Sequence, residues 1–210
     1  MGNRWWVRGY RLVFGVLALV AIAYQVTDLA DRAAFRPGNF FSFFTIQSNL
    51  VAAVVLLWGA TNDQARRDAV RVDLVRGAAT LYLCITGVVV VVLLSGMQDG
   101  LAVPIAWVDA VVHQVTPIVM VADWLLVPPT TRIPWRRALV WLAYPLLYAT
   151  YSLIRGLIVD WYPYPFLSPD QAGGYGAVAL NVVGIAVGAL LGTVPVVLVG
   201  NRLRALANQT

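Results

Sequence analysis

Six apolar stretches, each about 20 residues long, divide this chain and limit it to folds that cross a lipid bilayer. Their approximate bounds are Leu12–Ala30, Phe40–Gly59, Leu74–Ser95, Ile105–Val127, Trp135–Val159 and Gly176–Val199. Backbone groups inside hydrocarbon must satisfy their own hydrogen bonds, so each stretch is expected to form a helix. The sequence therefore predicts an all-α, polytopic membrane protein, with six transmembrane helices in one domain that covers residues 1–210.

The charged residues predict how this bundle lies in the membrane. The net charge is +5, and all 15 basic residues are arginine. Six spans would gather most of them on one side, namely Arg4, Arg8, Arg11, Arg66, Arg67, Arg71, Arg76, Arg132, Arg136, Arg137, Arg202 and Arg204. The other side would hold only Arg32, Arg36 and Arg155. Because basic residues accumulate on the cytoplasmic side, we expect both termini in the cytoplasm.

The same charge pattern bears on location and partners. Exclusive use of arginine in a basic, membrane-spanning chain indicates a bacterial plasma membrane as the location. No basic patch interleaves with aromatic residues outside the spans, so a nucleic-acid partner is not expected. Membrane lipids are the expected partners. The oligomeric state does not follow from the sequence.

Polar side chains recur at one depth in the apolar stretches. With the termini inside, they fall in the outer half of five helices: Gln25, Asp28, Thr45, Ser48, Asn49, Asp109, His113, Tyr151, Arg155 and Asn181. The spacing of Thr45, Ser48 and Asn49 puts them on one helix face, and Asp109 and His113 share a face four residues apart. This convergence predicts a polar pocket in the outer leaflet.

Each polar residue also has a structural interpretation. Serine and threonine in spans often bond to their own helix, and Asn49 and Asn181 can join neighbouring helices. Arg155 can extend to the lipid headgroups. His113 differs, because an ionisable residue inside a span is a functional candidate by default.

The residue types suit ester hydrolysis. A threonine hydroxyl such as that of Thr45 needs an adjacent base, and His113, the only histidine, is the natural choice. Asp109, one turn away, can orient the imidazole ring. Further candidates are Ser48, Asn49 and Asn181 as donors to an oxyanion, and Arg155 with Tyr151 as ligands of a substrate carboxylate. With one histidine and one cysteine, neither a metal site nor a cofactor is expected.

Three segments resemble the androgen-induced membrane protein family, which includes the androgen-dependent TFPI-regulating protein. They are FFTIQSNL, WVDAVVHQVTPIVMVADWLL and YPYPFL, at residues 43–50, 107–126 and 162–167. The resemblance implies a multi-pass hydrolase of fatty acid esters of hydroxy fatty acids, with Thr45 and His113 as the intramembrane catalytic pair. Two positions depart from the family pattern: Asp109 replaces an expected asparagine, and Arg155 is not a residue of the animal members.

The alternative is a non-enzymatic lipid-binding or transport protein of the membrane. A transporter is typically built from paired repeats around a site at the membrane midplane. This chain has no visible repeat of about 20 to 50 residues, and its polar residues lie to one side of the midplane. The pattern disfavours alternating access, and it leaves a receptor or scaffold function open.

Overall fold

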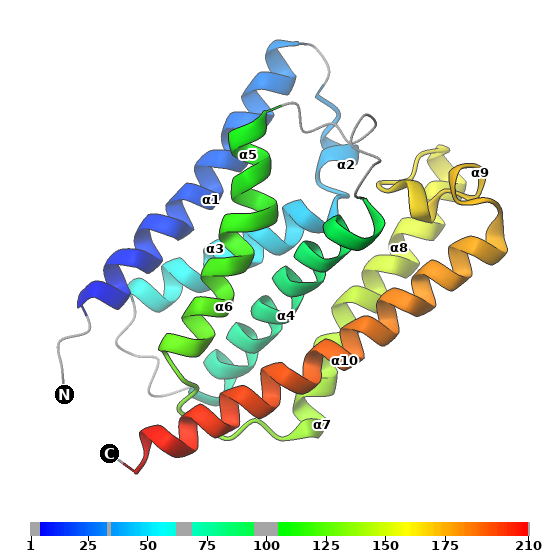
Figure 1. Cartoon of the computed structure of the whole chain (residues 1–210). Helices are drawn as coiled ribbons and strands as arrows, with labels where there is room; N and C mark the ends of the chain where they lie inside the picture. The colour runs from blue at the N-terminus through cyan, green and yellow to red at the C-terminus, as the bar shows by residue number, and fades with distance from the viewer. Residues whose placement is uncertain (1–4, 33–34, 62–68, 95–104, 210) are drawn as a thin grey trace.

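The structure, a computed structural model, describes residues 5–32, 35–61, 69–94 and 105–209. Within these residues six helices are long and apolar enough to cross a membrane, and no strand is present (Figure 1). The helices span Trp5–Asp31, Phe44–Thr61, Ala69–Leu93, Ala106–Leu126, Trp135–Val159 and Tyr175–Ala207. The predicted all-α, six-helix membrane fold is therefore confirmed. The predicted end at Ser95, and Arg4, Arg66 and Arg67 of the charge pattern, lie outside the described residues.

Four of the spans are single helices and two are composite. The single helices are α1 (Trp5–Asp31), α3 (Phe44–Thr61), α4 (Ala69–Leu93) and α10 (Tyr175–Ala207). The fourth span consists of α5 (Ala106–Ala110), the π-helical turn η3 (Val111–Val115) and α6 (Thr116–Leu126). The fifth consists of α7 (Trp135–Ala138), the 3₁₀ turn η4 (Leu139–Leu142) and α8 (Ala143–Val159). Three short elements join them: α2 (Pro37–Phe40), η5 (Pro165–Leu167) and α9 (Pro169–Ala172).

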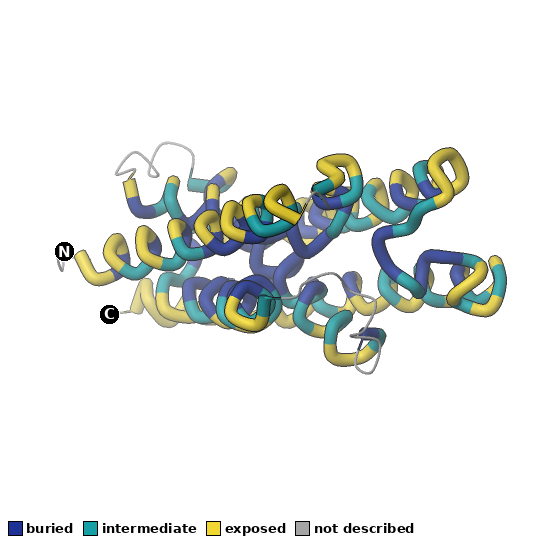
Figure 2. Tube along the Cα trace, turned by 90° about the horizontal axis from the view of Figure 1, so that it is seen from above, coloured by how far each residue is buried: buried dark blue, intermediate teal, exposed yellow. Residues whose placement is uncertain are grey.

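The central helix of the bundle is α4, which contacts α3, α6 and α10, while α1 lies along α3 (Figure 1). Buried residues lie on the inner faces of the helices and exposed residues on the outer faces (Figure 2). The exposed residues include many large apolar side chains, among them Val13, Leu147 and Leu180. A surface of this kind is suited to contact with lipid rather than water.

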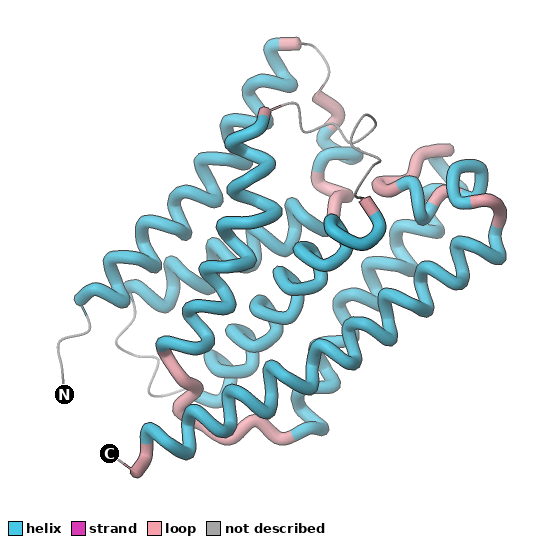
Figure 3. Tube along the Cα trace, in the orientation of Figure 1, coloured by secondary structure: helices cyan, strands magenta, loops and turns pink. Residues whose placement is uncertain are grey.

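The two ends of the bundle differ. The start of α1 and the end of α10 lie together at one end (Figure 1). The short elements α2, η5 and α9 lie at the other, where loops join the long helices (Figure 3). We call this second end the vestibule end, because a large cavity, the vestibule, is lined by residues of α2, η5 and α9 there.

The second span begins later than its apolar pattern predicts. The expected start was Phe40, but α2 ends there and α3 begins at Phe44. Tyr148 of α8 stabilises the break, because its hydroxyl donates to the Ser42 carbonyl at 2.8 Å and accepts the Phe44 N–H at 3.2 Å. A helix start is thereby held inside the protein.

A buried ion-pair cluster ties four helices together near the end opposite the vestibule. The Asp123 carboxylate of α6 accepts from Arg11 of α1 at 2.6 Å and from Arg76 of α4 at 2.7 Å. Tyr10 donates to the same carboxylate, and Arg11 also donates to the Gly59 carbonyl of α3. We call Tyr10, Arg11, Arg76 and Asp123 the Asp123 cluster. Two arginines of the topological pattern are therefore buried and paired.

Candidate active site

Thr45 lies at the start of a helix that begins inside the protein. It is the second residue of α3 and is 7% exposed. The first N–H groups of a helix have no partner within that helix. Here the N–H of Thr45 donates to the Tyr164 hydroxyl at 3.2 Å. The positive end of the helix dipole lies at this residue and favours negative charge beside it.

Two hydrogen bonds connect Thr45 to His113 and Asp109. The Thr45 hydroxyl lies 3.3 Å from Nε2 of His113, and Nδ1 of His113 lies 2.7 Å from Oδ1 of Asp109. Because a carboxylate accepts the Nδ1 proton, Nε2 presents its lone pair to the hydroxyl. The sequence predicted a common depth for these residues, and the structure brings them into one hydrogen-bonded series. The His113 side chain is 13% exposed and the Asp109 side chain 43% exposed.

The helix that carries His113 is locally widened into the π-helical turn η3. Pro117 has no N–H to offer, and the N–H of Thr116 bonds to the Val111 carbonyl, five residues back. The Val112 carbonyl therefore receives neither the N–H of Thr116, its partner in an α-helix, nor an N–H from Pro117, its partner in a π-helix. Turns of this kind are frequent at functional sites, and this one presents His113 toward α3.

Asn49 supplies the missing donor. Its Nδ2 donates to the Val112 carbonyl at 2.9 Å and to the Thr45 carbonyl at 2.9 Å. Both protons of the Asn49 amide are therefore engaged, and neither is free to donate to an oxyanion, which was the function predicted for Asn49. Fully buried, Asn49 instead holds together the backbone segments that carry Thr45 and His113.

Tyr164, which the sequence did not single out, completes the site. It directly precedes η5, is buried, and places its hydroxyl 3.3 Å from the Thr45 hydroxyl. Burial raises the pKa of Tyr164, so its phenol keeps the proton and can donate it. The signal was present in the YPYPFL segment, which the resemblance marked without assigning a function to this tyrosine.

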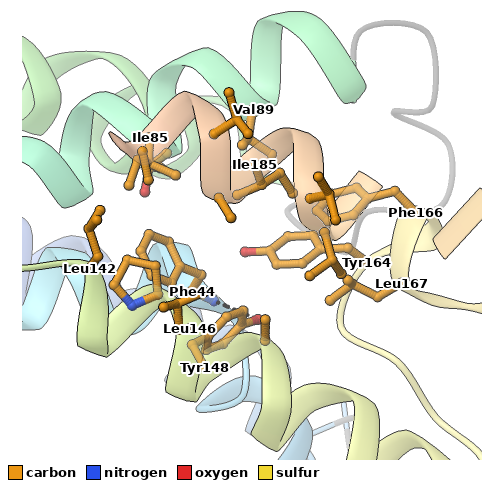
Figure 4. A pocket seen from close by; sticks show the side chains of 18 of the residues that line it. Phe44, Ile85, Val89, Leu142, Leu146, Tyr148, Tyr164, Phe166, Leu167 and Ile185 are labelled. Atoms are coloured by element: carbon orange, nitrogen blue, oxygen red, sulfur yellow. Dashed lines mark hydrogen bonds between the residues drawn. The ribbon is translucent and has the colours of Figure 1, made fainter. Parts of the chain in front are cut away.

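An apolar cavity of about 300 Å³ opens on one side of Thr45. Its walls come from α4, α8, α10 and η5, and the Tyr164 hydroxyl points into it (Figure 4). Apart from Thr45 and Tyr164, its polar lining residues are Thr86 and Tyr148. Several wall residues of α8 and α10 are also exposed on the outer surface of the bundle, namely Leu146, Val183, Val187 and Leu190. The cavity therefore lies between α8 and α10, beside exposed apolar side chains.

A larger and more polar cavity of about 810 Å³, the vestibule, opens on the other side of Thr45. His113 and Asp109 line it, together with residues of α1, α2, η5 and α9. Thr45 and Tyr164 line both cavities. The two hydroxyls therefore stand at the boundary between an apolar and a polar compartment.

Ser48 and Asn181, the other predicted oxyanion donors, bond to nearby protein groups. The Ser48 hydroxyl donates to the Thr45 carbonyl at 3.1 Å and lies 3.1 Å from the Thr86 hydroxyl. Nδ2 of Asn181 donates to the Phe166 carbonyl at 3.1 Å. These contacts support the start of α3 and the η5 turn.

Arg155 and Tyr151, the predicted ligands of a carboxylate, line neither cavity. Arg155 donates to Oδ1 of Asn39 at 2.7 Å, and its guanidinium lies 5.0 Å from the centre of the Trp161 ring. The Tyr151 hydroxyl lies 2.9 Å from the Ser42 hydroxyl. Both side chains thus attach α8 to the segment around α2. Arg36 is the cation that lines the vestibule among the described residues.

The fold and this site define a class: a six-helix membrane protein with a buried Thr–His–Asp series between an apolar cavity and a polar one. Among the described residues no group of three His, Cys, Asp or Glu side chains is placed to hold a metal ion. No protein-family model, no curated protein and no solved structure matches the chain.

Proposed function

We propose that this protein is an intramembrane hydrolase of lipid esters that uses Thr45 as nucleophile and His113 as base. The observation that carries the proposal is the hydrogen-bonded series of Thr45, His113 and Asp109. A threonine hydroxyl is a weak nucleophile unless a base takes its proton. The distance of 3.3 Å is long for a hydrogen bond, as catalytic contacts often are before substrate binds.

In the first half of the reaction, the Thr45 hydroxyl oxygen attacks the ester carbonyl carbon while its proton passes to Nε2 of His113. The carbonyl oxygen becomes an oxyanion, which the Tyr164 hydroxyl stabilises by donating its proton in a hydrogen bond. The Asp109 carboxylate stabilises the imidazolium. When the carbonyl reforms, the bond to the alcohol oxygen breaks, and that oxygen takes the proton from His113. An acyl ester on Thr45 remains.

In the second half, water from the vestibule attacks the acyl ester. His113 takes a proton from this water and returns it to the Thr45 oxygen as that bond breaks. The products are a free fatty acid and the intact threonine. The position of Thr45 on the wall of both cavities supports these reaction steps, because one cavity would hold hydrocarbon while the other admits water.

The apolar cavity supports a long-chain acyl group as the part of the substrate nearest the membrane. Its opening along α8 and α10 would admit the chain laterally from the bilayer. The resemblance of the three segments supports the same reaction, and it carries the expectation of fatty acid esters of hydroxy fatty acids. The cavities themselves support a long-chain ester and do not name its alcohol.

We also infer that both termini are cytoplasmic and that the site opens toward the outer leaflet of a bacterial plasma membrane. The arginine distribution supports this orientation. A tag placed after Thr210 should be protected from protease added to intact cells. Cleavage of that tag from outside would reverse the orientation and move the site to the inner leaflet.

The test of the reaction is hydrolysis of a long-chain ester by purified protein in detergent. Thr45→Ala and His113→Ala should each abolish hydrolysis, because members of such a series act as a unit. Thr45→Ser should retain part of it, and a fluorophosphonate probe should label wild-type protein at Thr45. Thr193→Ala is the matched control, since Thr193 is buried, bonds to the Ala189 carbonyl and lines neither cavity. Wild-type rates in Thr45→Ala would favour a lipid-binding protein instead.

A further inference from the structure

The charges around the vestibule are mostly negative. Among the described residues that line it, Arg36 is the cation, and Asp109, Asp160 and Asp170 are the anions. With His113 neutral, one positive and three negative charges give a formal charge of −2 for this lining. The whole chain carries +5, so the vestibule is acidic within a basic protein.

Two other arginines at this end are engaged elsewhere. Arg155 donates to Asn39 and lies over Trp161. Arg32 pairs with Asp28 at 2.8 Å. Neither arginine lines the vestibule. Arg155 contacts two residues that do, Asn39 and Trp161, so its charge offsets part of the negative charge of the carboxylates.

Aromatic rings add to the same preference. Phe40, Phe43, Trp161 and Tyr162 line the vestibule beside the carboxylates. Ring faces carry negative partial charge and attract cations, and the face of Trp161 already holds the guanidinium of Arg155 at 5.0 Å. The pKa of Tyr162 is raised, first by desolvation and then by Tyr175, Asp160 and Asp170.

The two cavities suit the two different parts of an ester substrate. The apolar cavity offers no Asp, Arg or His among its lining residues, so it suits the hydrocarbon chain of the acyl group. The alcohol part then lies in the vestibule, on the same side as His113, which must protonate it as it leaves. The charge of the vestibule therefore acts on the alcohol.

Resting on the proposed hydrolase function, we infer that the substrates are long-chain acyl esters of neutral or cationic alcohols. Asp160 and Asp170 are the residues that determine this specificity, because they repel an alcohol part that bears a free carboxylate. This separates the chain from the substrate class that its resemblance implies, in which the alcohol is itself a fatty acid.

The experiment compares esters of one acyl chain, palmitate, whose alcohol parts differ in charge. The palmitate ester of a hydroxystearic acid is supplied as the free acid and as its methyl ester, with palmitoylcholine as a cationic third substrate. Rates are measured in neutral detergent with full-length protein. We expect wild-type protein to cleave the methyl ester and the choline ester faster than the acid, by roughly three- to tenfold at low salt, with a smaller ratio at high salt.

Matched variants then test which charges set the ratio. Asp160→Asn and Asp170→Asn should each lower the methyl ester to acid ratio, while Arg36→Gln should raise it. Asp160 has a left-handed backbone (φ 52°), which asparagine also adopts readily, so Asp160→Asn should fold. The control is Asp28→Asn, which removes a charge from α1 that does not line the vestibule. The two esters can partition differently into detergent, and this affects the ratio of their rates for any single protein. The effect is the same for every variant, so it cancels when the ratios of two variants are compared.

The outcomes separate this inference from the function on which it rests. Opposite shifts of the ratio for the aspartate and Arg36 variants, with no shift for Asp28→Asn, support the inference. An unchanged methyl ester to acid ratio in Asp160→Asn and Asp170→Asn, or equal shifts for Asp28→Asn and the vestibule variants, overturns it and leaves the hydrolase intact. Failure to cleave any of the three esters overturns the hydrolase itself and this inference with it.

Discussion

Two groups of polar side chains lie inside this apolar bundle, and they differ in what their atoms contact. In the Asp123 cluster, one carboxylate accepts from two guanidinium groups and a phenol. In the site around Thr45, one carboxylate accepts from a single imidazole, whose other nitrogen faces a hydroxyl. The first group is closed on itself, whereas the second ends at a group that can react.

Their surroundings differ in the same direction. Arg11 and Arg76 are 8% and 6% exposed, and the cavity beside them is small, at about 130 Å³. Thr45 is as well buried as the arginines, but it lines cavities of about 300 and 810 Å³. Burial alone therefore does not distinguish a structural polar group from a functional one. The distinction lies in whether the buried atoms face protein partners or space for a ligand.

The sharpest test of this difference replaces one aspartate in each group by asparagine, which keeps the shape and removes the charge. Asp109→Asn should lower kcat by roughly 10³- to 10⁴-fold, because an amide no longer holds the His113 tautomer that accepts the threonine proton. A wild-type rate would show instead that the site works with asparagine here, the residue expected in the family that the three segments resemble. The Asp109 side chain is 43% exposed, so the melting temperature should change little. The measurements are ester hydrolysis and thermal unfolding in the same detergent. Loss of fold in Asp109→Asn would make it a structural residue like Asp123.

Asp123→Asn should have the opposite profile. Two buried guanidinium groups would lose their counter-charge, which typically costs about 3 to 5 kcal/mol of folding free energy. Thermal unfolding should show a large fall in melting temperature, and activity per folded molecule should persist at low temperature. A stable Asp123→Asn protein without activity would contradict the comparison, because it would place Asp123 in the reaction.

The fold was predictable because each span carries its own signal. Hydrocarbon requires long apolar helices, and the composition of each stretch supplies one. The local breaks were less visible. Pro117 predicts a disturbance of its helix, but neither the widened turn at 111–115 nor the late start at Phe44 follows from periodicity. The late start depends on Tyr148, which is remote in sequence.

Three members of the candidate site were predictable from the sequence, whereas Tyr164 and the contacts of the other candidates were not. The depth of Thr45, Asp109 and His113 indicated a shared pocket, because helical rise and spacing are regular. Asn49 and Arg155 were each given a ligand to bind, and each bonds to protein instead. Helix packing, and loops such as the one that carries Tyr164, decide which neighbour a polar side chain contacts. These contacts join segments that are distant in the sequence, so local patterns do not predict them.

Tyr164→Phe tests the residue that sequence reasoning missed, with an intermediate effect expected. Loss of one oxyanion donor should lower kcat by roughly 10²- to 10³-fold with little change in KM. In wild-type protein, the raised pKa of Tyr164 should keep the donor protonated, so activity should not fall as pH rises through the usual range of tyrosine. Tyr82→Phe is the control: Tyr82 is buried and donates to the Trp141 carbonyl, and it lines neither cavity. Equal losses in the two variants would assign Tyr164 to folding alone.

Arg155→Lys, with the smallest expected effect, tests whether Arg155 is a structural residue, like those of the Asp123 cluster, or part of the site around Thr45. It lies at the vestibule end, yet it bonds to Asn39 and lines neither cavity. Its Nη1 atom is buried and lacks a hydrogen-bond partner among the described residues, so a substrate carboxylate would reach it only after the protein moved. We therefore expect about 1 kcal/mol or less of lost stability and an unchanged ratio of rates for the methyl ester and the free acid. A selective loss of the acid substrate, measured on the same ester pair, would show that Arg155 binds a carboxylate and belongs with the site around Thr45.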